Sequence, residues 1–95
     1  MYKDLDPVLN TQVRLAIVSS LIKVKQADFN YLKQQCNTTQ GNMSHQLKKL
    51  KEVEYIEIIK TFSGNYPKTI CKITPKGISA FEAYVKTIKT YLDLE

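Results

Sequence analysis

The chain contains few of the residues that build disulfide-framed, collagenous or membrane-spanning proteins. Its 95 residues include two cysteines, three glycines and three prolines, and they include no tryptophan. Two cysteines are too few for a disulfide framework, and so little glycine and proline excludes a collagen-like or linker-rich chain. The most apolar stretch, 13–24, is interrupted by two lysine or arginine residues and two serines, so it falls short of the roughly 20 apolar residues of a membrane span. The composition therefore predicts a small soluble binding protein.

The amino terminus also lacks the apolar core of a secretory signal, because Asp4 and Asp6 stand where that core would lie. We therefore expect a cytoplasmic protein in which Cys36 and Cys71 are reduced thiols. Hydrophobic residues make up 43% and charged residues 24% of the chain, which is typical of a folded protein with one modest core. The length predicts a single domain over 1–95. The net charge of +5 favours an anionic partner.

Apolar spacing predicts three helices in the first half of the chain. Residues 10–24 carry apolar side chains at intervals of three and four, as an amphipathic helix does, and 27–36 form a shorter segment of the same kind. Asn37 tolerates the left-handed backbone of a tight turn. The Thr39 hydroxyl can cap a third helix over about 40–53.

The third helix is expected to bury one face and expose the other. Met43, Leu47 and Leu50 are spaced at i, i+4 and i+7, so they face the core. The opposite face is short, polar and mainly basic, and it consists of Gly41, Asn42, His45, Lys48, Lys49 and Glu52.

The second half predicts a β-hairpin followed by one helix. Residues 55–62 and 69–74 are rich in β-branched and aromatic side chains, and a turn-rich loop at 63–67 separates them. Thr74 followed by Pro75 is a helix-start signal. The last helix, about 75–93, has apolar residues at heptad spacing, namely Ile78, Phe81, Val85, Ile88 and Leu92. If it projects from a monomer, Ile88, Tyr91, Leu92 and Leu94 stay exposed, which favours pairing with a second chain.

Motifs for catalysis or metal binding are absent. His45 follows Ser44, but adjacent helical residues point about 100° apart and cannot act as base and nucleophile. The sequence has neither a glycine-rich phosphate loop nor a paired histidine motif. Cys36, His45 and Cys71 lack the spacing of zinc ligands, and both cysteines suit small apolar core sites. We expect no enzyme, no metal and no cofactor.

The turn at 36–39 joins two helices in the helix-turn-helix arrangement, whose second helix enters the major groove of DNA. The amides of Gln40 and Asn42 can pair with adenine, and lysines can reach phosphates or guanine. The DNA contacts expected from the turn and the third helix are Thr38, Thr39, Gln40, Asn42, Ser44, His45, Lys48 and Lys49.

The basic charge is concentrated in the same region. Residues 33–76 contain eight lysines and three glutamates. The net charge of this segment, +5, therefore equals the net charge of the whole chain. The hairpin tip offers small polar groups, a tyrosine and a lysine, and it fits a wing lying along a groove or the DNA backbone. The expected wing contacts are Ser63, Asn65, Tyr66 and Lys68.

These segments together resemble small winged helix-turn-helix transcriptional regulators of the MarR/ArsR-like kind. The likeness is carried by residues 5–8, 13–17, 27–29 with Leu32, 41–44, 47–50, 55–57 and 73–77. It implies a mainly α (α+β) winged helix fold in the order of three helices, two strands and one helix. It also implies a homodimeric regulator that represses by occupying a promoter, with the last helix as dimer interface. Asn37 stands where the family has a glycine, and the adjacent-cysteine metal box of arsenical sensors and the longer ligand-binding helices are missing.

A homodimer of this kind would read a pseudo-palindromic site with half-sites about 34 Å apart. The alternative is a winged helix used for protein–protein contact, in which the third helix meets an acidic protein surface. A third and least favoured hypothesis is that the chain is an enzyme or a metal sensor.

Overall fold

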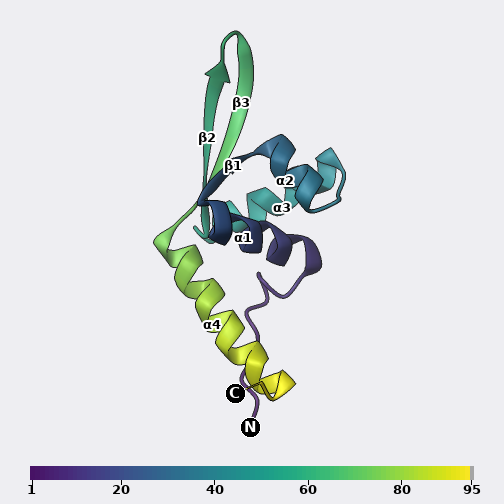
Figure 1. The fold of residues 1–95 in the computed structure, drawn as a ribbon, viewed down its shortest axis with the longest axis vertical. Helices are drawn as coiled ribbons and strands as arrows, with labels where there is room; N and C mark the ends of the chain where they lie inside the picture. Colours follow the sequence, from purple (N-terminus) through teal and green to yellow (C-terminus); the bar gives the residue numbers. More distant parts are fainter. Residues whose placement is uncertain (95) are drawn as a thin grey trace.

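The computed structural model describes residues 1–94 and confirms the mainly α winged helix-turn-helix fold. Along the chain, the elements are α1 (Gln12–Val24), β1 (Gln26–Asp28), α2 (Phe29–Gln35), α3 (Gln40–Glu52), β2 (Ile56–Ser63), β3 (Tyr66–Ile73) and α4 (Pro75–Leu92). The molecule is elongated, with extents of 54 × 25 × 21 Å. Helices α1 to α3 pack at the base of the sheet, while the β2–β3 hairpin projects at one end and α4 at the other (Figure 1).

The core lies between the first three helices and the base of the sheet. Met43, Leu47 and Leu50 are buried there, which confirms the predicted inner face of α3. The other core residues come from the turn before α1, from α1, α2, the sheet and α4, and they are Leu9, Ile17, Val18, Leu21, Leu32, Ile56, Cys71, Ile73 and Tyr84.

The short strand β1 was not predicted, and the helix expected to begin at Ala27 begins at Phe29 instead. The sheet has the order β1-β3-β2, and β1 pairs antiparallel with residues 70–72 of β3. Asp28 ends the strand in an extended conformation and caps α2 by accepting a hydrogen bond from the Tyr31 amide at 2.8 Å. The pairing partner lies more than 40 residues away, so local apolar spacing could not reveal it.

The hairpin is longer and its turn tighter than predicted. Ser63, Tyr66 and Pro67 belong to the strands, and the turn consists of Gly64 and Asn65. Gly64 has a φ of 65°, a conformation that glycine adopts at low cost in two-residue hairpin turns. Pro67 is tolerated because β1 does not reach it, so that edge of β3 has no partner strand there.

The predicted helix caps are confirmed. The Thr39 hydroxyl accepts a hydrogen bond from the Asn42 amide at 3.2 Å, and the Thr74 hydroxyl accepts one from the Gly77 amide at 2.9 Å. Asn37 has a φ of 48°, the left-handed conformation expected of the turn between α2 and α3. These caps fix where α3 and α4 begin.

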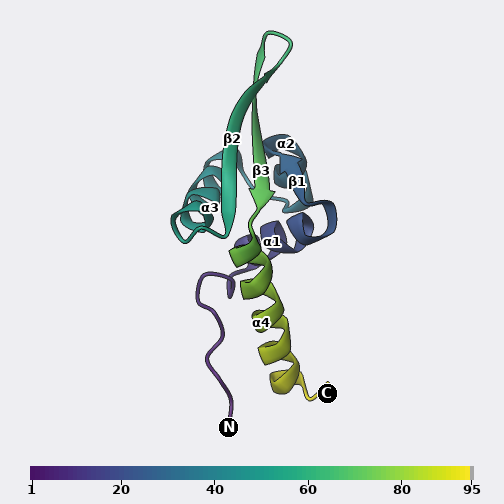
Figure 2. The same cartoon turned by 90° about the vertical axis from the view of Figure 1, so that its left-hand side faces the viewer.

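Helix α4 leaves the body of the molecule and is accompanied by the amino-terminal segment (Figure 2). The Tyr84 hydroxyl donates to Asn10 Oδ1 at 3.0 Å, and the Tyr91 hydroxyl donates to the Lys3 carbonyl oxygen at 2.6 Å. The rings of Tyr2 and Tyr91 lie 4.8 Å apart. Within residues 1–94, no helix has the length and apolar character needed to cross a bilayer.

The apolar stripe of α4 is only partly covered. Ile78, Phe81, Val85 and Ile88 are half-buried. The expectation that Ile88 is exposed is therefore wrong, because this side chain packs against the core. Leu92 is 59% exposed, and beside it Tyr91 and Leu94 are 41% and 65% exposed.

Candidate nucleic-acid interface

The outer face of α3 carries the polar side chains that the sequence assigned to it. Because the apolar residues of α3 turn inward, the polar ones on the other side meet solvent. The exposed residues of α3 are Gln40, Gly41, Ser44, His45, Lys48, Lys49, Lys51 and Glu52, with the exposed capping residue Thr39 just before them.

Asn42 and Thr38 are less exposed than the other DNA contacts predicted for the turn and α3. Both are half-buried, and the Asn42 side-chain amide donates to Thr38 Oγ1 at 2.8 Å. Asn42 Oδ1 accepts a hydrogen bond from Gln46 Nε2 at 3.0 Å. The Asn42 amide is therefore held in one orientation at the edge of the exposed face.

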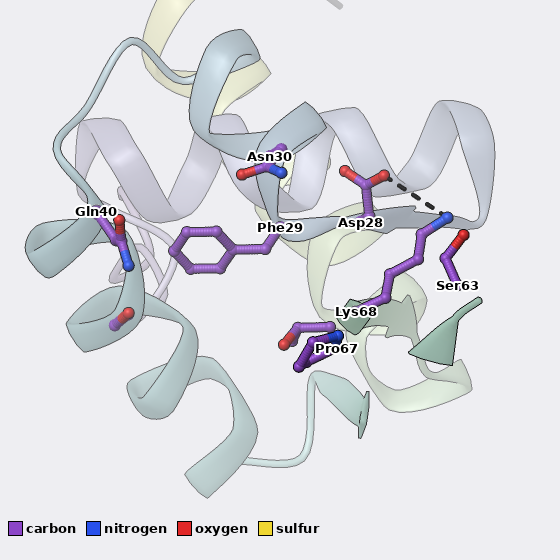
Figure 3. A pocket seen from close by; sticks show the side chains of 9 residues that line it. Asp28, Phe29, Asn30, Gln40, Ser63, Pro67 and Lys68 are labelled. Atoms are coloured by element: carbon purple, nitrogen blue, oxygen red, sulfur yellow. Dashed lines mark ion pairs between the residues drawn. The ribbon is translucent and has the colours of Figure 1, made fainter. Parts of the chain in front are cut away.

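A groove of about 460 Å³ separates α3 from the hairpin (Figure 3). It brings together two predicted α3 residues, Gln40 and Ser44, and two predicted wing residues, Ser63 and Lys68. The remaining lining residues are Asp28, Phe29, Asn30, Pro67 and Thr69. Asn65 and Tyr66 do not line the groove, because they lie at the tip of the hairpin.

An ion pair between the end of β1 and β3 lines this groove. Lys68 Nζ lies 3.9 Å from Asp28 Oδ2, and the two side chains are 41% and 36% exposed (Figure 3). An exposed pair of this kind contributes less than about 1 kcal/mol. Lys68 can therefore exchange Asp28 for a phosphate at little cost in free energy.

The wing also exposes residues that the sequence analysis did not single out. Phe62 is 70% exposed and pairs with Pro67 across the hairpin, and Lys60 is exposed two residues earlier. The predicted wing residue Tyr66, near them, is 78% exposed. Alternation places Phe62 on the same sheet face as the buried Ile56, so its residue type indicated a core position. The hairpin extends beyond the hydrophobic core, and Phe62 lies in the part that extends. Local sequence does not show where the core ends.

The two cysteines lie in apolar surroundings. Cys71 is fully buried in β3, and burial together with the charge of Asp28 raises the pKa of its thiol to about 11. Burial also raises the pKa of the half-buried Cys36 thiol. Both groups are therefore protonated thiols near neutral pH. Among residues 1–94, no three histidine, cysteine, aspartate or glutamate side chains lie close enough together to hold a metal ion.

We expect a thiol reagent at pH 8 to modify Cys36 slowly and Cys71 only after unfolding, because Cys71 is inaccessible and its pKa is the more strongly raised. Timed labelling followed by mass spectrometry measures both rates. The Cys36→Ser variant should lose the native-state reaction. Equal labelling of both cysteines in the folded protein would contradict this placement.

The helix-turn-helix, the exposed polar face of α3 and the adjoining hairpin define a winged helix DNA-binding domain. Residues 13–92 match the family model described as winged helix DNA-binding domain, and the chain belongs to this family. The winged helix DNA-binding family indicated by the sequence is thereby confirmed.

The chain is similar in sequence to one archaeal protein and in fold to several solved structures. The chain is 42% identical over 81 residues to an uncharacterized protein of Methanocaldococcus jannaschii, covering 85% of this chain and 88% of the relative. A transcriptional regulator homologue from Pyrococcus horikoshii superimposes with a TM-score of 0.84 at 23% identity, over 90% of this chain and 85% of that one. The PcaV transcriptional regulator of Streptomyces coelicolor gives a TM-score of 0.73 at 12% identity, over 93% of this chain and 72% of that one.

Proposed function

We propose that the chain, as one domain over 1–95, is a sequence-specific double-stranded DNA-binding regulator that represses transcription as a homodimer. The observation that carries this proposal is the outer face of α3, which is polar, basic and exposed beside a projecting basic hairpin. Membership of a DNA-binding family supports it. Such a dimer would exclude the transcription machinery from a promoter by occupying it.

In this proposal α3 enters the major groove and the wing follows the adjoining groove or backbone. Gln40 reads base edges, Lys48 and Lys49 contact phosphates or guanine, and hydroxyl groups contact phosphate oxygens. Further contacts are proposed for Thr38, Thr39, Asn42, Ser44, His45, Ser63, Asn65, Tyr66 and Lys68.

The proposed dimer interface is the apolar stripe of α4. Its outer end exposes Tyr91, Leu92 and Leu94, an apolar patch that a second copy of the helix can cover. The proposed interface residues are Ile78, Phe81, Val85, Ile88 and Leu92. Pairing through α4 would leave both α3 helices free, because α4 extends away from α3 and from the wing (Figure 1).

We expect Leu92→Asp to convert the homodimer to a monomer, since it places a charge in the apolar patch at an exposed site where folding is little affected. Affinity for a two-half-site duplex should then fall by roughly 100-fold, as an intramolecular second contact is lost. Sedimentation equilibrium and binding titrations measure both effects. Thr90→Asp, a change on another face of α4, is the control. A monomeric wild-type protein that binds the full site tightly would contradict the dimer.

Selection of bound fragments from a random duplex pool tests the proposed function. We expect a symmetric consensus with half-sites about one helical turn apart. Affinity should fall steeply between about 0.05 and 0.2 M salt. A protein-interaction module would show no enriched sequence and only weak charge attraction to duplexes at about 0.1 M salt.

A further inference from the structure

Arg14 is a buried charged residue within the apolar helix α1, only 8% exposed. Its guanidinium donates three hydrogen bonds to neutral oxygen atoms. Nε donates to the Val8 carbonyl at 2.6 Å and Nη2 to the Pro7 carbonyl at 3.4 Å. Nη1 donates to Gln46 Oε1 on α3 at 2.6 Å. The guanidinium thus links the amino-terminal segment to the helix that carries the candidate interface.

The hydrogen bonds continue from Gln46 to the start of α3. Gln46 Nε2 donates to Asn42 Oδ1 at 3.0 Å, and Asn42 Nδ2 donates to Thr38 Oγ1 at 2.8 Å. We call these four side chains, from Arg14 to Thr38, the amide chain. It runs from the core side of α3 to the edge of its exposed face.

The direction of the amide chain is set by Arg14, because a guanidinium can only donate. Gln46 must turn its oxygen toward Arg14, so its NH2 group faces Asn42. Asn42 must then turn its oxygen toward Gln46 and its NH2 group toward Thr38. Without a donor at the start, each amide could rotate by 180° and exchange its donor and acceptor ends.

Asn42 keeps free hydrogen-bonding capacity while it is held in this way. A side-chain amide offers two N–H donors and two acceptor positions on oxygen, and the amide chain uses one of each. One donor and one acceptor remain, which is the pair that reads adenine at N7 and N6. The orientation of the amide decides which end meets which adenine atom.

The guanidinium itself is firmly held. The carbonyls that accept from it belong to a turn in which the Val8 amide donates to Asp6 Oδ1 at 2.8 Å. The other oxygen of that carboxylate accepts from the Tyr55 hydroxyl at 2.5 Å. Burial and Asp6 raise the pKa of Tyr55 to about 12, so the phenol remains a donor near neutral pH. The turn is thereby anchored to the residue preceding β2.

We propose that Arg14 is a positioning residue that sets base preference from a distance, by fixing the orientation of the Asn42 amide through Gln46. The inference rests on the proposed DNA binding by α3. It assigns a role in specificity to two residues, Arg14 and Gln46, that lie behind the exposed face.

Gln46→Glu tests the direction of the amide chain with little change in shape. A carboxylate only accepts, so it keeps the bond from Arg14 but obliges Asn42 to turn its NH2 group toward it. Side-chain amide NMR signals of Asn42 in the free protein should move. Duplex selection should show a changed base preference at one position of each half-site, by about tenfold, with the other positions kept. Affinity for random duplex, measured for the wild type and for this variant, gives the effect of the added negative charge on binding to any sequence.

Arg14→Met and Gln46→Met interrupt the amide chain without reversing it. Both should reduce preference at that same position by about tenfold, and neither should reduce it further in an Asn42→Ala background. Val18→Ala is the control, because it removes core packing and should leave the base profile intact. Gln46 is half-buried and lies outside the hydrophobic core cluster, so Gln46→Met remains informative if Arg14→Met does not fold.

Two results would overturn the inference. One is an Asn42 amide signal in the free protein that Gln46→Glu leaves unchanged, which tests the amide chain even if no duplex binds. The other is a base profile that survives all three substitutions or weakens evenly at every position. Absence of duplex binding by the wild-type protein would instead refute the proposed function.

Discussion

Reversing the charge of two lysines on α3, in the double variant Lys48→Glu, Lys49→Glu, is expected to lower affinity for every duplex by roughly 100-fold at about 0.1 M salt. Both side chains are exposed on the face proposed to meet DNA. Loss of two phosphate contacts should also reduce the slope of log affinity against log salt by about 2. Stability should change by less than about 0.5 kcal/mol, because neither side chain packs in the core.

The matched control makes the same charge change on another element. Lys76→Glu with Lys86→Glu alters two exposed lysines of α4, which extends away from α3 (Figure 1). Fluorescence anisotropy against one duplex at several salt concentrations compares the two double variants. A similar loss of affinity in both would indicate that net charge, and not the α3 face, governs binding.

Substituting Gly77 is expected to have the largest effect on stability. Gly77 is buried in the first turn of α4, and a Cβ built there would lie 2.2 Å from the Tyr55 carbonyl oxygen. That oxygen also accepts from the Thr74 amide at 3.2 Å, and the Thr74 hydroxyl donates to the Glu54 carbonyl at 2.7 Å. The backbone cannot shift there without breaking these two hydrogen bonds, which join the start of α4 to the residues before β2. Gly77→Ala should therefore cost about 3 kcal/mol, or roughly 15 °C in Tm.

Gly41→Ala is the control for this prediction. Gly41 is exposed in α3, and apart from its chain neighbours and the adjoining helix backbone, no atom lies within 4 Å of an added Cβ. Alanine should stabilise α3 there by about 0.5–1 kcal/mol, because it has the higher helix propensity. Thermal and urea unfolding of both variants measure the difference. A Gly77→Ala variant within 1 kcal/mol of the wild type would contradict the close packing of α4 against Tyr55.

The features that the sequence predicted correctly depend on neighbours along the chain. The buried face of α3 follows from the spacing of Met43, Leu47 and Leu50. The caps at Thr39 and Thr74 follow from a hydroxyl placed directly before a helix. Periodicity and capping act within one or two turns, so these features can be read without knowing the tertiary structure.

Most of the features that were missed depend on residues distant in sequence. Strand β1 exists because it pairs with β3, and the amide chain begins at Arg14, 32 residues before Gln46. Within the amide chain, the pairing of Asn42 with Gln46 is an i, i+4 contact that helical spacing could have indicated. The half-buried position of Asn42 could not have been inferred in the same way, since it requires knowing what lies behind α3.

Backbone amide NMR of the protein titrated with a selected duplex locates the surface that α3 presents to DNA. We expect the largest shift changes at the exposed residues of α3 and along the β2–β3 hairpin, with the outer face of α4 unaffected. Saturable changes confined to other surfaces, with the signals of Gln40, Ser44 and Lys48 unmoved, would contradict binding of α3 in the major groove.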